Sequence, residues 1–261
     1  MLRPRVIPCL LLQDGGLVKT VRFKDAKYVG DPVNAIKIFN EKLVDELMVV
    51  DIDATVEGRG PDLKLIRDFA VECRMPLTYG GGVTSVEQVQ DIVGLGVEKV
   101  ALSHTAIENP GLLTEMASAV GSQSVVAVLD VKPGGLMGGR YDIYTHNGTR
   151  RVKADLFDMI ATLQDAGIGE LVINAIHNDG EMKGYDLKLA TKVMEHLRVP
   201  VTFLGGAGRL EDISALVEAC GTVGCAAGSL FVFKGRYRAV LINYPDPGTK
   251  EVLFGAPATP G

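Results

Sequence analysis

Two glycine pairs, half a chain apart, are the residues best suited to hold an anion. Gly80-Gly81 and Gly205-Gly206 each follow a short apolar run that contains a threonine, and they lie 125 positions apart in a chain of 261 residues. Glycine after a strand lets backbone N–H groups approach an anion closely. The pattern predicts one ligand with a phosphate at each end, and the alternative is that the glycines only permit tight turns.

A second stretch repeats at the same offset and adds hydroxyl groups to the predicted phosphate sites. Residues 96–104 align with residues 221–229, again 125 positions apart. Self-similarity at half length indicates a fold built from two like halves. Paired glycine loops followed by a small hydroxyl residue on the next unit are typical of a barrel anion site. The candidate phosphate-binding residues are Gly80, Gly81, Gly82, Ser103 and His104 in one half and Gly205, Gly206, Gly228 and Ser229 in the other.

Carboxylates at the ends of apolar runs suit proton transfer. Asp130 ends one such run, so we expect it to be partly desolvated and to point inward. Carboxylates at the mouth of a barrel can act as general acids or bases. Capping of a neighbouring loop is the alternative role for Asp130. Asp53 competes with Asp51 for the same role, so a structural role for Asp51 is the alternative. Asp179 lies beside Gly180, and a role in that turn is the alternative for it.

Four charged residues stand at or near the starts of predicted strands, at the end of the barrel opposite to the carboxylates. They are Arg5, Glu46, Lys99 and Glu170. Side-chain alternation along the first strand places Arg5 on the same face as the position expected at the catalytic end, Leu11. Two cations and two anions at the bottom of a barrel would be a costly choice for stability alone. The alternative is an ordinary salt-bridged rim.

These residues belong to eight apolar runs that alternate with helical patterns. Near-continuous Val, Ile and Leu runs suit parallel strands covered on both faces. We predict strands at 5–12, 46–51, 76–79, 99–102, 125–130, 170–174, 201–204 and 223–226, and helices at 31–44, 62–73, 85–95, 110–119, 154–166, 186–197 and 210–219. Eight such units favour a closed (β/α)8 TIM barrel. A doubly wound open sheet is the alternative, but no G-x-G-x-x-G motif follows the first strand.

The pattern predicts a single barrel domain over residues 1–261. Its half-barrels would span about 1–120 and 121–245. The remaining tail, 245–261, is rich in Pro, Gly and Thr, and we expect its end to fray.

Two predicted loops on the active face are longer than their neighbours. One covers residues 14–32 and holds Lys19, and the other covers residues 131–153 and contains Gly138 among its glycines. Long loops after barrel strands build the active face, so we expect both to act as lids. A plain surface insertion is the alternative for each loop.

Composition argues against several classes of partner. The formal net charge is −5 and the chain has no dense stripe of Lys and Arg, which argues against nucleic acid. No apolar run reaches about 18 residues and no signal peptide opens the chain, so we expect a cytoplasmic protein without a membrane partner. The four cysteines have no zinc-ligand spacing, and we expect neither a metal, a disulfide nor a cofactor.

With these residues in view, the chain resembles the cyclase subunit of imidazole glycerol phosphate synthase, the HisF family. The resemblance covers essentially residues 3–235 and is carried by many motifs in the same order. Among them are Ile7-Pro8-Cys9-Leu10, Gly30-Asp31-Pro32, Leu77-Thr78-Tyr79-Gly80-Gly81-Gly82, Tyr144-Thr145-His146, Asp179-Gly180 and Gly205-Gly206-Ala207-Gly208. The resemblance implies a ribulose-phosphate-binding barrel, duplicated from half-barrels, with a phosphorylated small-molecule ligand.

The resemblance also implies a partner and a route for ammonia. Members of the family dock a HisH-like glutaminase at the N-terminal face of the barrel, and ammonia travels through the barrel to the active face. Arg5, Glu46, Lys99 and Glu170 match the family's ammonia gate residue for residue. The implied substrate- and phosphate-binding positions are Lys19, Asp51, Gly81, Gly82, Ser103, His104, Asp179, Gly180, Gly205, Gly206, Gly228 and Ser229.

One departure from the family bears on catalysis. The family uses two aspartates as general acid and base; the second is present as Asp130, but the first position holds Leu11, which cannot transfer a proton. Such groups typically contribute ~100- to 10,000-fold each. Further departures are Ser103-His104 in place of Asn and a hydroxyl residue, Leu204 in place of serine and Asn174 in place of threonine. The ammonia route is intact while the acid–base pair is broken.

This combination is similar to the HisF paralogues of surface-polysaccharide gene sets, the WbuZ type. That similarity implies a synthase subunit that passes ammonia from its glutaminase to a separate sugar amidotransferase in lipopolysaccharide or O-antigen synthesis. One alternative is a working lyase-type cyclase of histidine biosynthesis, which joins ammonia to a ribulosyl aminoimidazole carboxamide substrate and yields imidazole glycerol phosphate and AICAR. Another is a non-catalytic scaffold that activates the glutaminase. Whether His104 or His177 replaces the lost proton donor stays open.

Overall fold

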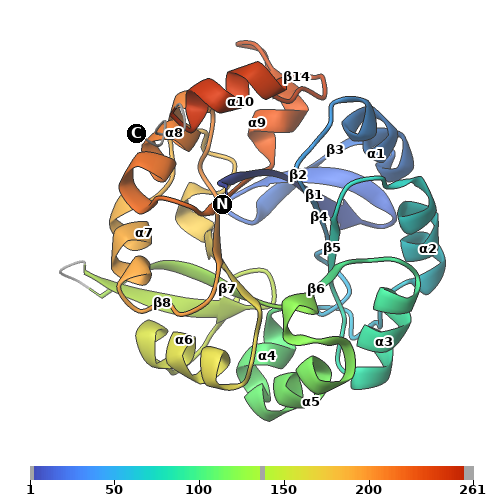
Figure 1. Cartoon of the computed structure of the whole chain (residues 1–261), viewed down its shortest axis with the longest axis vertical. Helices are drawn as coiled ribbons and strands as arrows, with labels where there is room; N and C mark the ends of the chain where they lie inside the picture. The colour runs from blue at the N-terminus through green and yellow to red at the C-terminus, as the bar shows by residue number, and fades with distance from the viewer. Residues whose placement is uncertain (1–2, 136–138, 256–261) are drawn as a thin grey trace, which may run out of the picture.

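Eight parallel strands close into a barrel with helices around it, in a computed structural model that describes residues 3–135 and 139–255 (Figure 1). In order around the barrel the strands are β1 (Arg5–Gln13), β4 (Leu47–Asp51), β5 (Leu77–Gly80), β6 (Lys99–Leu102), β7 (Val125–Gly134), β10 (Glu170–Ala175), β11 (Val201–Leu204) and β12 (Gly224–Ala227). β12 pairs in parallel with β1, with Arg5 opposite Gly224, and this pairing closes the barrel. The predicted (β/α)8 fold is confirmed.

Helices connect the strands and cover the outside of the barrel (Figure 1). The long ones are α1 (Pro32–Glu41), α2 (Leu63–Glu72), α3 (Val86–Gly94), α5 (Pro110–Val120), α6 (Leu156–Asp165), α7 (Leu187–Met194) and α8 (Leu210–Cys220). Four of them start at an aspartate whose side chain accepts hydrogen bonds from first-turn amides: Asp31, Asp62, Asp155 and Asp186. Such caps satisfy otherwise unpaired N–H groups, so they fix where each helix begins. No described helix has the length and apolarity required to span a membrane.

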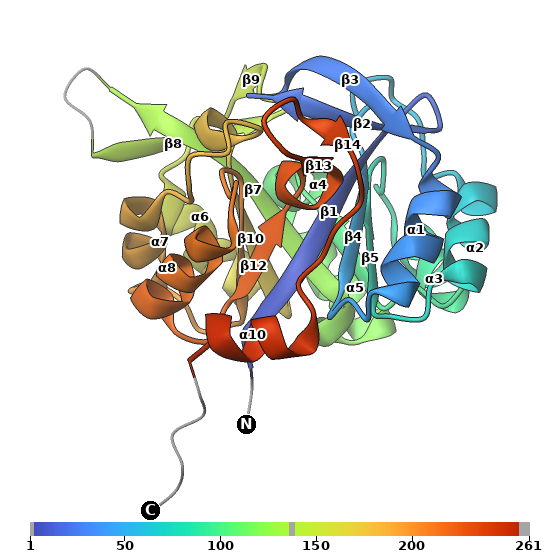
Figure 2. The same ribbon diagram turned by 90° about the horizontal axis from the view of Figure 1, so that it is seen from above.

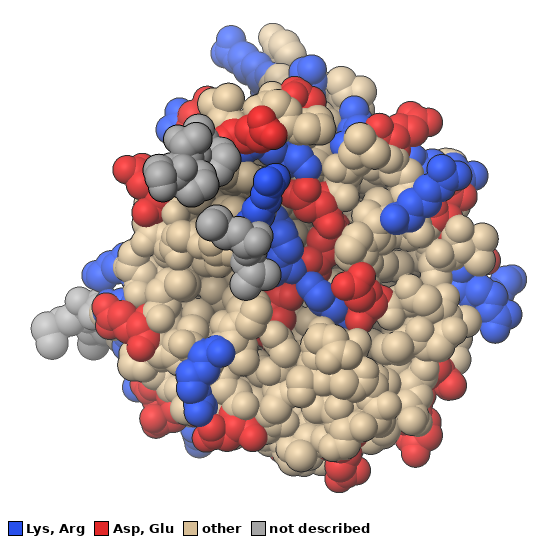
Figure 3. All heavy atoms as spheres, viewed as in Figure 1, with Lys and Arg blue, Asp and Glu red and all other residues tan. Residues whose placement is uncertain are grey.

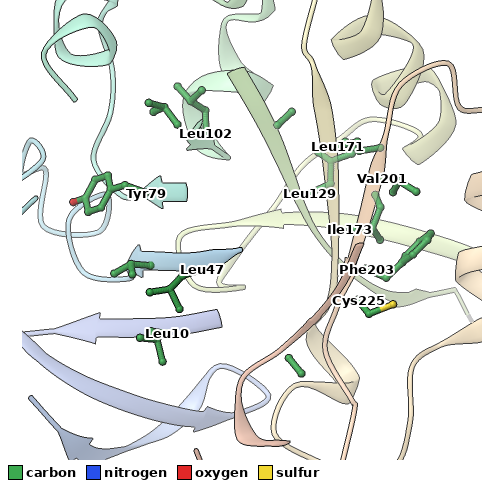
Figure 4. Packing of buried hydrophobic residues seen from close by; sticks show 14 of the residues in the cluster. Leu10, Leu47, Tyr79, Leu102, Leu129, Leu171, Ile173, Val201, Phe203 and Cys225 are labelled. Carbon is green, nitrogen blue, oxygen red and sulfur yellow. The ribbon is translucent and has the colours of Figure 1, made fainter. Parts of the chain in front are cut away.

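The hydrophobic core has two parts, one on each side of the barrel wall. The larger part is made of side chains from the strands and from the surrounding helices. Figure 4 shows some of its strand residues, among them Leu10, Leu47 and Phe203. The smaller part fills the barrel interior and contains Ile7 and Cys9 of β1. Alternation along β1 therefore sends odd-numbered side chains inward and even-numbered ones outward. Each fully buried large apolar side chain contributes about 1.5–3 kcal/mol.

The two long segments predicted as loops are β-hairpins, so that part of the prediction was wrong. β2 (Gly16–Val21) pairs with β3 (Lys24–Gly30), and β7 runs on past the barrel to pair with β8 (Arg140–Thr145), which pairs with β9 (Arg150–Arg151). Gly138 lies outside the described residues. Both hairpins rise from the same end of the barrel (Figure 2).

The first hairpin escaped prediction because its turn lacks the usual residues. Arg22 and Phe23 form the turn with φ angles of 53° and 62°, in the left-handed region where Asn and Gly are normally found. The amide of Arg22 donates to the carbonyl of Asp179 over 2.9 Å, and the Phe23 amide donates to Asp179 Oδ2 over 3.2 Å. Contacts from outside the hairpin therefore stabilise a turn that its own residues disfavour.

Short helices and a C-terminal helix complete the fold. α4 (His104–Glu108) follows β6, and α9 (Ser229–Val232) follows β12, 125 positions later. A small hairpin of β13 (Phe233–Lys234) and β14 (Ala239–Val240) precedes α10 (Pro247–Leu253). Part of the predicted tail is thus helical as α10, while its end, where we expected fraying, lies outside the described residues.

Candidate active face

A cavity opens where the barrel interior meets the hairpins, at the C-terminal ends of the strands. Two carboxylates line it, Asp51 at the end of β4 and Asp130 on β7. Much of the remaining wall comes from apolar barrel side chains, including Leu11, Val50 and Leu204. A concave wall in which apolar side chains surround converging polar groups is typical of a small-molecule site.

The two carboxylates differ in how many hydrogen bonds their oxygens already accept. Asp51 Oδ1 accepts from the amides of Asp53 (3.0 Å) and Ala54 (3.1 Å), and Oδ2 lies 3.4 Å from the Arg59 guanidinium. Asp51 therefore holds its own loop in place. Within the described part of the chain, Asp130 accepts one side-chain hydrogen bond, from the amide of Asn174 to Oδ1 over 2.8 Å. Asp130 is the carboxyl group better placed to move a proton in the cavity.

The environment of Asp130 favours its protonated form. Burial raises its pKa from the ordinary 3.8 to about 7, a nearby Asp179 adds to the rise, and the Asn174 hydrogen bond opposes it. Burial acts in this direction because a carboxylate loses hydration in an apolar wall. A group with a pKa near neutrality can serve as acid or base at physiological pH.

Asp130 should make the protein less stable as the pH rises from about 4 to about 7. The folded pKa lies above the unfolded one, so in that window the folded chain holds a proton that the unfolded chain has released. Relative to Asp130→Asn, the free energy of unfolding should fall by at most about 1.4 kcal/mol per pH unit and then level off. Urea unfolding of both proteins across this range measures the difference, and parallel curves would contradict the assignment.

Leu11 occupies the position opposite to Asp130 in the predicted pair. Its side chain packs on the apolar cluster inside the barrel and also lines the cavity. It brings no exchangeable proton, so the cavity wall holds one free carboxyl group where the resemblance predicts two.

The predicted phosphate-binding residues separate into two pockets. Gly80, Gly81, Gly82, Ser103 and His104 line the cavity that contains Asp130. A second, smaller pocket is lined by Lys19, Asp179, Gly180, Gly205, Gly206, Gly228 and Ser229. The structure thus brings the members of each set together, but Lys19 joins the pocket of the other half. Its ammonium donates to the carbonyl of Cys9 over 2.6 Å, and burial lowers its pKa against the opposing effects of Cys9 and Asp179.

Two of these glycines are required by neighbouring backbone. A Cβ on Gly81 would lie 2.5 Å from the carbonyl oxygen of Asp51, and one on Gly206 would lie 2.1 Å from that of Gly184. Both have positive φ angles, 126° and 114°. Close backbone packing therefore explains why these two positions are glycine without any ligand. The support for phosphate binding comes instead from the pockets that these residues line.

Asp179 and Gly180 hold the first hairpin against the barrel mouth. Thr20 Oγ1 donates to Asp179 Oδ2 over 2.7 Å, in addition to the two turn amides already described. Gly180 lies directly against β2, because a Cβ there would stand 2.2 Å from the carbonyl oxygen of Thr20. The segment after β10 in the second half thus positions a hairpin of the first half.

Gly180→Ala is expected to destabilise the protein by about 2–4 kcal/mol, because φ is +66° and the methyl group collides with backbone. Gly94→Ala is the matched control: Gly94 ends α3, and an added Cβ meets nothing within 4 Å. Alanine there should be neutral or stabilising by up to about 1 kcal/mol. Thermal unfolding of the two variants compares them, and equal effects would refute close packing at Gly180.

Two of the histidines line the cavity, and His177 does not. His104 and His146 both line the cavity, with ring centroids 4.6 Å apart in an edge-to-face arrangement. Burial, then Arg150 and His104, lower the pKa of His146. His177 instead lies 3.0 Å from Asp186 and does not line the cavity. Of the two histidines considered from sequence, only His104 stands near Asp130.

His146 and Asn147 belong to the cavity although sequence reasoning did not select them. They form the turn after β8 with positive φ angles, 52° and 53°. The Asn147 amide donates to the carbonyl of Ile52 over 2.9 Å, which fixes the turn above the cavity. The only available signal was the stretch Tyr144-Thr145-His146, which matched the family motif.

The four predicted gate residues form a closed ring of ion pairs at the other end of the barrel. Lys99 Nζ lies 3.0 Å from Glu46 and 2.9 Å from Glu170. Arg5 lies 2.7 Å from Glu170 and also pairs with Glu46. Each cation thus contacts both carboxylates. Figure 3, which views this N-terminal face, shows basic and acidic side chains gathered around the barrel axis, with uncharged surface below them.

The ring is mostly withdrawn from water. The side chains of Glu46 and Glu170 are 4% and 7% exposed, against 28% for Arg5. Burial raises the pKa of Glu170, but the hydrogen bond and charge of Arg5 and the charge of Lys99 outweigh it and hold the pKa below its ordinary value. Above the ring, the axis is filled by apolar side chains. The ring therefore separates solvent from an apolar interior.

Three acidic residues meet where the segments after β1 and β4 come together. Carboxylate oxygens of Asp14, Asp53 and Glu57 lie within 4.8 Å of one another. Their spacing suits a divalent cation, although exposed acidic groups often gather without one. Sequence reasoning did not bring them together, because Asp14 follows β1 and the other two follow β4.

The chain is similar in sequence to proteins of one known family. The family model described as "Histidine biosynthesis protein" matches residues 5–238. A Vibrio vulnificus protein, provisionally named imidazole glycerol phosphate synthase subunit hisF3, is 55% identical over 251 residues, 96% of each chain. A Pseudomonas aeruginosa protein, provisionally named subunit hisF2, is 47% identical over 252 residues, 97% of this chain and 100% of that one. Imidazole glycerol phosphate synthase subunit HisF of Alkaliphilus metalliredigens is 35% identical over 232 residues, which are 88% of this chain and 91% of that one.

Proposed function

The chain belongs to the histidine biosynthesis protein family, among its HisF-like members, and on that premise we propose that it is the synthase subunit of a glutamine amidotransferase system. In this proposal a HisH-like glutaminase docks on the N-terminal face and releases ammonia at the charged ring. Ammonia then moves through the barrel to the cavity at Asp130.

The interior of the barrel supports this route. Neutral ammonia can enter an apolar interior, whereas ammonium would pay a large desolvation penalty. The ring of Arg5, Glu46, Lys99 and Glu170 lies at the entrance, and the cluster around Ile7 lies directly above it. We propose that the ring passes ammonia and excludes ions and bulk water.

The observation that carries the finer proposal is the contrast between an intact ring and an incomplete acid–base pair. Leu11 lines the cavity beside Asp130, where a cyclase of this family needs a second carboxyl group. We infer that this chain is a paralogue that delivers nitrogen to a separate sugar amidotransferase in surface-polysaccharide synthesis. Relatives at 47% and 55% identity whose names mark them as second and third copies support a paralogue.

The histidine-pathway cyclase is the second candidate. Asp130 remains, and both sets of predicted phosphate-binding residues line pockets. In this case a bisphosphate substrate would span the two pockets of the two half-barrels, about 1–120 and 121–245, and His104 or His146 would supply the missing proton. The third candidate function is a non-catalytic scaffold that only activates the glutaminase.

The proposal is tested by mixing the purified chain with a HisH-type glutaminase. We expect a one-to-one complex in analytical ultracentrifugation and faster glutamine hydrolysis, but little turnover of the histidine-pathway substrate with ammonium. Absence of a complex would refute the amidotransferase assignment. Cyclase turnover near that of the family would instead select the second candidate. Stimulation that is unchanged by Asp130→Asn, without any transfer of nitrogen, would select the scaffold.

A further inference from the structure

Three hairpins at the C-terminal end of the barrel concentrate positive charge. We define the basic rim as residues 16–30, 139–153 and 233–240, which carry β2–β3, β8–β9 and β13–β14. These segments hold eleven Lys or Arg and two Asp or Glu, whereas the rest of the chain holds sixteen against thirty. A chain with a net charge of −5 thus presents a strongly basic region at one end. Such separation of charge favours association with an oppositely charged partner.

The three segments form one continuous surface. Lys27 Nζ lies 6.0 Å from the ring centroid of Phe233, so the β2–β3 and β13–β14 hairpins are neighbours. On the other side, a Cβ on Gly148 would lie 3.4 Å from the Phe23 ring, so the turn after β8 touches the turn of β2–β3. Figure 2 shows β2, β3, β9 and β14 at the same end of the molecule. The basic rim therefore adjoins the mouth of the Asp130 cavity.

Most cations of the basic rim are exposed and form no ion pair among the described residues. Arg22 pairs with Glu181, and Arg140 and Arg151 share Asp142. Among the residues that the structure describes, no ion pair is formed by the exposed Lys24, Lys27, Arg150, Lys153, Lys234, Arg236 and Arg238. None of these seven lines either pocket. They are therefore not placed to bind a ligand inside the cavity.

Exposed apolar side chains accompany these charges. Tyr28 is 66% exposed, Tyr237 90%, Val240 47% and the adjoining Leu241 53%. β3 pairs only with β2 among the described strands, so it presents a free backbone edge. Tyrosine and arginine beside exposed aliphatic groups are typical of protein interfaces. This composition favours a protein partner over a nucleic acid or a lipid headgroup.

We propose that the basic rim docks an acidic face of the enzyme that consumes the ammonia. The inference rests on the proposed function, since ammonia that crosses the barrel reaches solvent at this end. A partner seated on the hairpins would cover the cavity mouth and receive ammonia before it is protonated in bulk water. The positive surface would steer that partner to the exit and away from the glutaminase face.

The test replaces Tyr237 by a photo-crosslinking phenylalanine in the native host and identifies what is captured. We expect an enzyme that transfers nitrogen to a sugar substrate. Lys24→Glu, Lys27→Glu and Arg236→Glu together should reduce capture at least about tenfold. The matched control reverses three exposed lysines on helices, Lys37, Lys64 and Lys188, and should leave capture unchanged.

Capture of nucleic acid, of another class of protein or of nothing would overturn the docking proposal, and so would equal loss in both triple variants. Glutaminase binding is measured in the same variants, because that surface lies on the opposite end. Preserved glutaminase binding with lost capture supports the basic rim and shows that the variants are folded. Preserved glutaminase binding with preserved capture refutes the rim but leaves the proposed function intact.

Discussion

Replacing Lys99 by methionine is expected to lower the free energy of unfolding by about 3–5 kcal/mol. The substitution leaves Glu46 and Glu170, which are 4% and 7% exposed, with Arg5 as their only cation in the ring. An uncompensated buried carboxylate keeps its desolvation penalty and loses the attraction that offset it. Urea unfolding at neutral pH measures the loss.

Two further variants separate charge balance from packing. Lys99→Met combined with Glu170→Gln removes one charge of each sign and should recover much of the loss. Lys37→Met breaks an exposed pair with Glu72, 3.8 Å apart, and should cost no more than about 1 kcal/mol. A loss for Lys99→Met as small as that for Lys37→Met would show that the ring is an ordinary solvated rim.

Leu11→Asp is expected to raise cyclase turnover of the histidine-pathway substrate, with ammonium as the nitrogen source, by ~100- to 10,000-fold. The substitution supplies a second carboxyl group to the cavity wall that contains Asp130. Steady-state formation of imidazole glycerol phosphate measures the change. Such a gain requires that the substrate site survives and that only the proton-transfer group is missing.

Leu11→Asn is the matched control, because it has a similar shape to aspartate and cannot transfer a proton. It should stay at the level of the unmodified chain, and Leu11→Asp combined with Asp130→Asn should lose the gain. An inactive Leu11→Asp variant that is still folded would mean that the cavity has lost the bisphosphate site as well. High activity without any substitution would contradict the paralogue assignment.

The barrel was predictable because its signals are local. The strands at 99–102 and 201–204 have the predicted bounds, since each is a short apolar run that the fold buries on both faces. The predicted helix starts at 31, 62 and 186 fall on the aspartates that cap α1, α2 and α7. The β2–β3 hairpin was missed because Arg22 and Phe23 form its turn with left-handed backbone that contacts with Asp179, 156 or more positions away along the chain, stabilise.

The candidate site was predictable as a set of residues but not as an arrangement. The repeat at 125 positions grouped the glycines correctly by pocket. It could not reveal that Lys19 reaches the pocket of the other half, or that His146 stands beside His104. These placements depend on how hairpins fold over the mouth, which no local pattern encodes. Asp51 was also predicted as a binding position, yet its Oδ1 accepts hydrogen bonds from its own loop.

Each half of the molecule contributes a residue to the mouth of the other half, so neither half is complete alone. Lys19 comes from the first half and lines the second pocket, while Asp179 comes from the second half and holds the turn of the first hairpin. Severing the chain near residue 121 should therefore give two fragments with defective mouths, and mixing them should restore both. Each half thus completes the mouth of the other, so we expect neither fragment alone to form its own pocket.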